Sequence, residues 1–121
     1  MEGEEIIVVS TNYISGYRIT KVFGTIWGIT VRSRGIGGNM MAGLRALKGG
    51  EIKEYIQLLN DARNTALQRL KEEAKTIGAN AVIDVKFDSS DFAQIMTEIV
   101  AYGTAVVVEP VGEKTEPVSL S

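Results

Sequence analysis

Three aspartates, Asp84, Asp88 and Asp91, form the densest group of acidic side chains in the chain. Carboxylate oxygens at such spacing are ligands that a hard cation such as Ca²⁺ or Mg²⁺ accepts. A calcium loop would also have a glycine at its turn and a bidentate glutamate at its far end, and this segment has neither. The run Asp88-Ser89-Ser90-Asp91 is typical of a β-turn for reasons unrelated to metal. We therefore predict a turn here, with a cation site as the alternative.

A glycine-rich segment could bind an anion. Arg32 and Arg34 lie next to Gly35, Gly37 and Gly38. Glycine-rich turns before a helix expose backbone N–H groups that attract anions. The spacings of the Walker and dinucleotide motifs are both absent. We favour a connector or a subunit contact over an anion site.

Glu98 is a carboxylate within the apolar run that includes Val100 and Tyr102. A carboxylate in such surroundings could transfer protons. It could equally pair with Arg45 or Lys86, or face solvent in the central opening of a ring of subunits. We favour the structural role.

Three aromatic residues could stack on a flat ligand such as a flavin, if their strand lines a cleft between subunits. They are Tyr17, Phe23 and Trp27, which alternation places on one face of a strand. Aromatic residues on a strand more often belong to a core than to a cofactor platform. We therefore interpret them as core residues.

The chain contains no histidine and no cysteine. This excludes disulfides, thiolate nucleophiles and zinc sites built from Cys and His. It also excludes every catalytic arrangement that depends on a histidine base. Catalysis would have to use carboxylates, Lys, Tyr or an imported cofactor, and we expect that the protein is not an enzyme.

Composition describes one ordinary domain. The 121 residues carry a net charge of −2 with no basic block, so we expect no nucleic-acid binding. The amino terminus is acidic where a secretory signal would be basic, and no apolar run approaches the length of a membrane span. These features predict a cytoplasmic protein.

Hydrophobic periodicity predicts a long helix packed on a sheet. Alternating or apolar runs indicate strands over 6–10, 17–31 and 81–87, and a strand pair or one bent strand over 92–108. A stripe at steps of three and four indicates a helix over 51–77, which Gly78 ends. Met40, Leu44 and Leu47 suggest a short helix that ends at Gly49-Gly50. Gly24 and Gly28 mark a bulge, a close backbone approach or, as we favour, a bend in one long strand. We expect residues 1–109 to form a single domain and residues 110–121 a flexible tail.

The last strand is apolar on both faces. One of these faces carries the apolar residues Met96, Val100, Tyr102, Val106 and Val108. Two apolar faces need two covers, and only one long helix is available. A second copy of the chain is the most economical second cover.

The order of short motifs along the chain resembles the YbjQ-like family of small proteins, whose descriptive name is "putative heavy-metal-binding domain". The motifs are Gly16-Tyr17-Arg18-Ile19, Met41-Ala42-Gly43-Leu44-Arg45, Gly49-Gly50, Tyr55, Ala62-Arg63, Ala66, Gly78-Ala79-Asn80-Ala81-Val82 and Gly103-Thr104-Ala105-Val106. The resemblance extends from Ile6 to Glu109. It implies an α+β two-layer subunit, with an antiparallel sheet packed against one long helix, that assembles into a ring. The ring is typically a homopentamer with the sheets joined across subunits.

The chain departs from the family pattern in two places. Relatives commonly carry an Arg-Ser pair after the double glycine, where this chain has Glu51-Ile52. Some relatives have a cysteine near the first strands, and its absence here excludes a heavy-metal site built on sulfur. The family has no established activity, so the resemblance supplies no catalytic residues, and it leaves the metal or cofactor ligands of this chain unassigned.

Three functions remain open. The leading hypothesis is a homo-oligomeric module that binds a small ligand or metal ion, with any sites between subunits. The second is a structural or regulatory oligomer that binds a protein partner. The third, and least favoured, is an enzyme that uses carboxylates, because no acid–base pair can be named.

Overall fold

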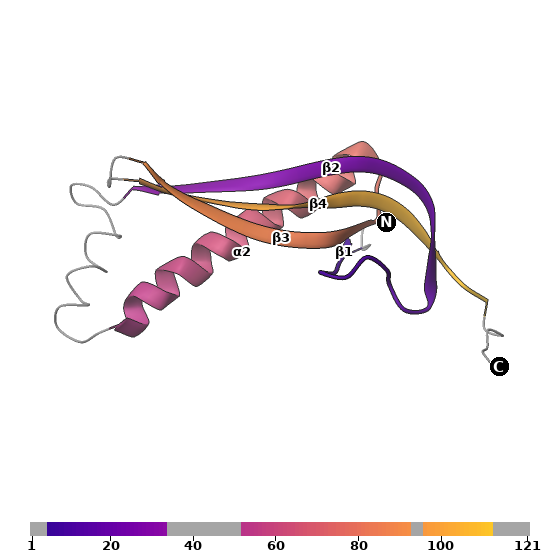
Figure 1. The fold of residues 1–121 in the computed structure, drawn as a ribbon, viewed down its shortest axis with the longest axis horizontal. Coiled ribbons are helices and arrows are strands. Elements are labelled where there is room, and N and C mark those ends of the chain that lie inside the picture. Colours follow the sequence, from indigo (N-terminus) through magenta and orange to yellow (C-terminus); the bar gives the residue numbers. More distant parts are fainter. Residues whose placement is uncertain (1–4, 34–51, 93–95, 113–121) are drawn as a thin grey trace.

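The computed structural model describes residues 5–33, 52–92 and 96–112, in which one helix packs on one face of a four-stranded sheet (Figure 1). The elements are β1 (Ile7–Val8), β2 (Tyr17–Ser33), α2 (Ile52–Ile77), β3 (Ala81–Phe92) and β4 (Met96–Pro110). This confirms the predicted α+β two-layer fold. The expected short helix near Met40, most of the glycine-rich segment and residues 113–121 lie outside the described residues. No helix in the described ranges is long and apolar enough to cross a membrane.

The helix α2 matches the predicted range closely and ends as expected. Gly78 has a φ of 96°, and the amide of Ala79 donates to the carbonyl of Ala74 at 2.9 Å. This six-residue closure is a Schellman motif, which needs a left-handed residue and therefore favours glycine. The buried face of the helix consists of fully buried residues at steps of four: Ala62, Ala66, Leu70 and Ala74. Small side chains at three of these four steps let the helix approach the sheet closely.

The strands follow the order β1-β3-β4-β2. The pairs β2–β4 and β3–β4 are antiparallel, whereas the two-residue β1 pairs parallel with β3. The sheet is therefore mixed, and its three long strands are antiparallel as predicted. A parallel neighbour is allowed here because β1 and β3 are far apart in sequence and the connection between them is long.

Two glycines of β2 have separate roles. Gly24 lies at a register shift and has a φ of 119°, so it forms a bulge. Gly28 is buried where the backbone of α2 passes over the strand: a Cβ there would lie 2.9 Å from the carbonyl carbon of Arg69. The favoured interpretation of a simple bend is therefore incomplete, because both alternatives occur, one at each glycine.

The predicted turn over Asp88-Ser89-Ser90-Asp91 is wrong. These residues continue β3, and they pair with β4 from Asp88 opposite Val100 to Asp91 opposite Thr97. The backbone ladder with β4 overrides the local preference of Asp and Ser for turns. The strand consequently extends five residues beyond the predicted end, from Phe87 to Phe92.

The face of the sheet opposite α2 is partly covered by the same chain. Ala81, Ile83, Val106 and Val108 are buried there, with Ile7, Val9 and Ile14 packed against them. Val106 and Val108 therefore do not need a second copy as cover, in contrast to the sequence-based expectation. The part that remains open lies further along the sheet, on β2.

Candidate functional site

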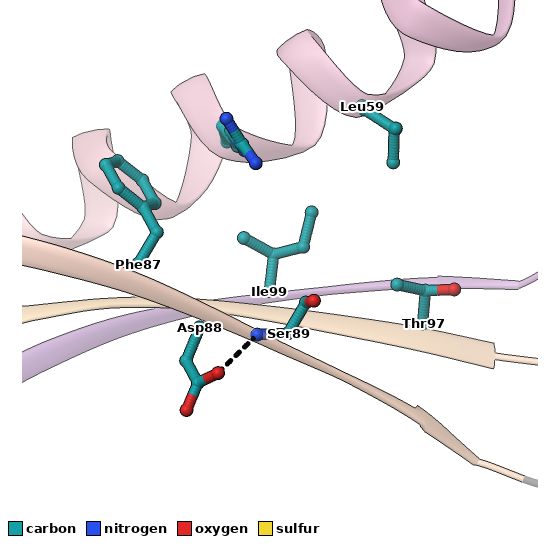
Figure 2. Close-up of a pocket in the computed structure, with 7 residues that line it drawn as sticks. Leu59, Phe87, Asp88, Ser89, Thr97 and Ile99 are labelled. Carbon is teal, nitrogen blue, oxygen red and sulfur yellow. Dashed lines mark hydrogen bonds between the residues drawn. The ribbon is translucent and has the colours of Figure 1, made fainter.

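A cavity of about 340 Å³ lies between the first half of α2 and the adjoining parts of β3 and β4. Seven residues line it: Leu59, Arg63, Phe87, Asp88, Ser89, Thr97 and Ile99. Figure 2 shows the side chain of Leu59 pointing from the helix toward the sheet, and the side chains of Phe87 and Ile99 pointing from the strands toward the helix. The cavity volume falls within the range of about 300–1,000 Å³ that is typical of small-molecule sites.

The register between β3 and β4 determines which side chains form the floor of the cavity. Ser89 lies directly opposite Ile99, so both side chains emerge on the face that α2 covers. Phe87 lies two residues earlier on β3 and therefore on the same face. Ile99 is buried and supplies an apolar base. The hydroxyls of Ser89 and Thr97 add polar groups to this surface.

Arg63 is the cationic group of the site. It follows Ala62, whose complete burial against the sheet fixes this turn of the helix. The Cζ atom of Arg63 lies 5.8 Å from the centre of the Phe87 ring, within the range of a cation–π contact. No carboxylate in the described part of the chain pairs with Arg63. The ion pair found there joins Arg18 to Glu109, at 3.4 Å.

Asp88 lines the rim of the cavity, but its carboxylate points away from the helix (Figure 2). Its Oδ1 accepts a hydrogen bond from the backbone N–H of Ser89 at 3.0 Å. Alternation along β3 explains this orientation, since Asp88 lies between two residues that face α2. The negative charge is thus held on the other face of the sheet, and Arg63 determines the charge inside the cavity.

The three aspartates do not share a turn. Asp84 lies at the register shift of β3 with a φ of 55°, and its amide donates to the carbonyl of Thr11 at 2.8 Å. Asp91 lies in the strand, and its side chain is outside the described part of the structure. Within the described residues, no three acidic side chains are grouped to hold a metal ion. The strand spreads the three residues along its length, so the described part of the structure does not gather them into the cation site that the sequence suggested.

The other sequence-predicted candidates also lie apart from one another. Of the arginine and glycine segment, only Arg32 is described, as a strand residue opposite Thr97, and Arg34, Gly35, Gly37 and Gly38 fall outside the described ranges. Glu98 is half-buried on the face away from α2, opposite Val31 on one side and Ser90 on the other. No ion pair joins it to Lys86, and Arg45 lies outside the described residues.

The predicted aromatic group does not form a platform. Trp27 lies opposite Tyr102, on the face away from α2, and is 56% exposed. Phe23 instead lies near the end of the helix, where a Cβ on Gly78 would be 3.9 Å from its ring. Tyr17 is at the start of β2, opposite Pro110. The register shifts of β2 separate the three rings. The interpretation as core residues is also wrong, because Tyr17 and Phe23 are exposed like Trp27.

Of the residues that line the cavity, Asp88 alone was named from the sequence as a candidate, as a cation ligand. Leu59 and Arg63 are four residues apart on α2 and therefore lie on one side of the helix. That spacing was a usable signal. The contribution of Ser89 could not be foreseen, because the segment around it was expected to be a turn.

An open apolar surface lies on β2, on the face that α2 does not cover. It consists of Trp27, Ile29 and Val31, and we call it the open β2 face. Ile29 is 36% and Val31 51% exposed. The strand is also at the edge of the sheet, with β4 as its neighbour. Adjacent exposed apolar residues on an edge strand commonly mark an interaction surface.

The amino-acid sequence matches a family model and the sequences of several known proteins. A sequence model of the YbjQ family, described as "Putative heavy-metal-binding", matches residues 6–109. The UPF0145 protein Ta0182 of Thermoplasma acidophilum is 68% identical over 117 residues, which are 97% of this chain and 98% of that protein. The UPF0145 protein PTO0347 of Picrophilus torridus is 64% identical over 118 residues, 98% of this chain and 99% of that protein.

The fold is also similar to that of solved structures, for example the following one. It is a protein of unknown function from Pediococcus pentosaceus that belongs to the DUF74 family. The TM-score is 0.57 at 14% sequence identity, and the match covers 86% of this chain and 98% of that chain. At this identity the similarity concerns the fold alone.

Proposed function

Since the chain belongs to the YbjQ family, we propose that it is a homo-oligomeric module that binds a small ligand and has no enzymatic activity of its own. The observation that carries the proposal is the open β2 face, an apolar surface that the described part of the subunit leaves uncovered. We keep a ring of five subunits as the expected assembly, because the family resemblance implies it, and the cytoplasm as the expected location.

The edges of the sheet support a head-to-tail assembly. The outer edge of β3 is occupied near its start, where the amide of Val85 donates to the carbonyl of Val9 at 3.0 Å. From Lys86 onward β3 has no described neighbour on that side, and β2 has none on its own outer edge. Two unlike edges that pair between copies create a heterologous contact, and such a contact forms a ring when the rotation between successive copies closes.

Part of the β2 edge is already covered within the subunit. The guanidinium of Arg69 donates to the carbonyl oxygen of Ile29 at 2.8 Å. A neighbouring strand would displace this hydrogen bond or pair on either side of it. The apolar side chains of the open β2 face are not affected, so the proposal depends on them more than on the edge carbonyls.

A small organic ligand suits the cavity better than a metal ion. Cations require several oxygen, nitrogen or sulfur ligands around one point. Among the described lining residues the one carboxylate belongs to Asp88, and it points away from the space (Figure 2). The rest of the lining is apolar or carries a hydroxyl, apart from Arg63.

The oligomer is tested by a matched pair of substitutions, Ile29→Glu and Ile56→Glu. Both isoleucines are exposed, 36% and 49% respectively, but Ile29 belongs to the open β2 face and Ile56 lies on the helix. We expect light scattering after size exclusion to show an oligomer for the wild type and Ile56→Glu, and a monomer for Ile29→Glu. A buried charge without a partner costs several kcal/mol, so dissociation should be nearly complete.

A circular dichroism spectrum confirms that each variant remains folded. An unchanged oligomer with Ile29→Glu would show that the open β2 face is not the interface. A monomeric wild type would contradict the proposed self-assembly. It would favour the alternative that the open β2 face binds a different protein.

A further inference from the structure

We propose that the cavity beneath α2 binds a small organic anion, one carboxylate on an apolar body, and that Arg63 receives the carboxylate. The inference names the ligand class of the small-ligand site and therefore rests on the proposed function. It concerns a region within one subunit, so the ligand can be tested separately from the assembly.

The charge of the cavity favours an anion. Arg63 contributes a guanidinium for which the described residues provide no carboxylate partner. The single acidic residue of the lining, Asp88, directs its carboxylate to the other face of the sheet. A bound carboxylate would give Arg63 the counter-ion that the protein does not supply, through a charge-assisted hydrogen bond.

The number of cationic groups favours one negative charge. Arg63 is the only cation among the seven lining residues. A doubly charged ion such as inorganic phosphate would meet one guanidinium among the described lining residues and has no apolar body to contact Leu59, Phe87 and Ile99. A monocarboxylate matches the single guanidinium.

The remaining lining determines the body of the ligand. Leu59, Phe87 and Ile99 provide apolar surface on both the helix and the strands. The hydroxyl of Ser89 is the kind of polar group that fixes orientation in an otherwise apolar site. A carboxylate on a flat or aliphatic apolar body satisfies both kinds of surface.

Phe87 also prepares Arg63 for this role. The guanidinium lies above the Phe87 ring, with its Cζ 5.8 Å from the ring centre. This contact to the ring leaves the N–H groups of the guanidinium, whose fork binds a carboxylate in a bidentate manner, without a carboxylate partner among the described residues. Lysine in the same position would supply the charge without this geometry.

The test is a titration of the ¹⁵N-labelled full-length protein, followed by NMR, with benzoate and with its uncharged analogue benzamide. We expect benzoate to shift the amide signals around Phe87, Ser89 and Thr97. Benzamide should bind at least about tenfold more weakly, because it has no negative charge and cannot form the charge-assisted hydrogen bonds that benzoate forms with Arg63. Inorganic phosphate should bind more weakly than benzoate.

Arg63→Gln removes the charge and should reduce the preference for benzoate over benzamide to about onefold, whereas Arg63→Lys should leave an intermediate preference. The control is Lys75→Gln, which removes one positive charge from the same helix roughly 18 Å further along its axis. This control should bind benzoate as the wild type does.

Equal affinity for benzoate and benzamide, or unchanged benzoate affinity in Arg63→Gln, would overturn the inference, as would failure of benzoate to bind. Signal shifts that map to another part of the fold would also overturn it. The subunit count of the same samples is read by light scattering. An intact oligomer that fails to bind benzoate refutes the ligand class and leaves the proposed assembly standing.

Discussion

Gly28→Ala tests the close contact between α2 and β2. Gly28 is buried, and an added methyl group would lie 2.9 Å from the carbonyl carbon of Arg69. It would lie even closer to the carbonyl oxygen of Ala66 and the amide nitrogen of Leu70. All three atoms belong to the helix backbone, so no side chain can rotate away to make room. The helix must move outward as a unit, or the strand must bend.

The expected cost follows from two opposing effects. Overpacking a well-packed core costs about 1–3 kcal/mol, and three backbone contacts below the normal van der Waals distance place this case at the upper end. Replacing glycine by alanine also restricts the unfolded chain, which stabilises the fold by about 0.4–1 kcal/mol. The net loss is about 2 kcal/mol of unfolding free energy. For a chain of this size, that lowers the melting temperature by roughly 8 °C.

The assay is thermal denaturation followed by circular dichroism, with Gly112→Ala as the control. A Cβ on Gly112 meets no atom within 4 Å, so this control should change the melting temperature by only a degree or two. Both variants are compared at one protein concentration, because subunit association adds to apparent stability. A Gly28→Ala protein as stable as the wild type would refute the close approach of helix and strand.

Two further predictions concern the start of β3. Asn80→Ala removes two hydrogen bonds to the backbone of Val108, one to its carbonyl at 3.0 Å and one from its amide at 2.8 Å. Urea denaturation should show a loss of about 1–3 kcal/mol of unfolding free energy. The control Asn64→Ala, at an exposed position of α2, should change the unfolding free energy little. Asp84 has a φ of 55°, so Asp84→Val should cost about 1–2 kcal/mol while Asp84→Asn remains near neutral in the same experiment. Equal effects of the two Asp84 substitutions would contradict the left-handed conformation at that position.

Local signals along the chain predicted the helix well. The apolar stripe identified the buried residues Ala62, Ala66, Leu70 and Ala74, and Gly78 identified the end of α2. Both signals act within a few residues, so the sequence around them contains the necessary information. The role of Gly28 was also among the stated alternatives, although the nature of the approaching backbone could not be known.

Predictions that depended on distant parts of the chain failed. The turn at Asp88-Ser89-Ser90-Asp91 was wrong because pairing with β4 outweighs local turn preference. The expectation that a second copy must cover Val106 was wrong, because Ile7, Val9 and Ile14 pack over that part of the sheet. These residues lie almost a hundred positions earlier in the chain. The cavity itself was missed for the same reason, since Arg63 and Phe87 come together only when the helix and sheet pack.

The most direct test of the proposed function is native mass spectrometry of the full-length protein, purified without added metal or chelator. One spectrum reports the number of subunits and any molecule that they retain. We predict a homo-oligomer, with five subunits as the expected count, that carries a small organic ligand in the wild type and loses it in Arg63→Gln. A monomer, or an oligomer whose retained mass is a metal ion, would contradict the proposal.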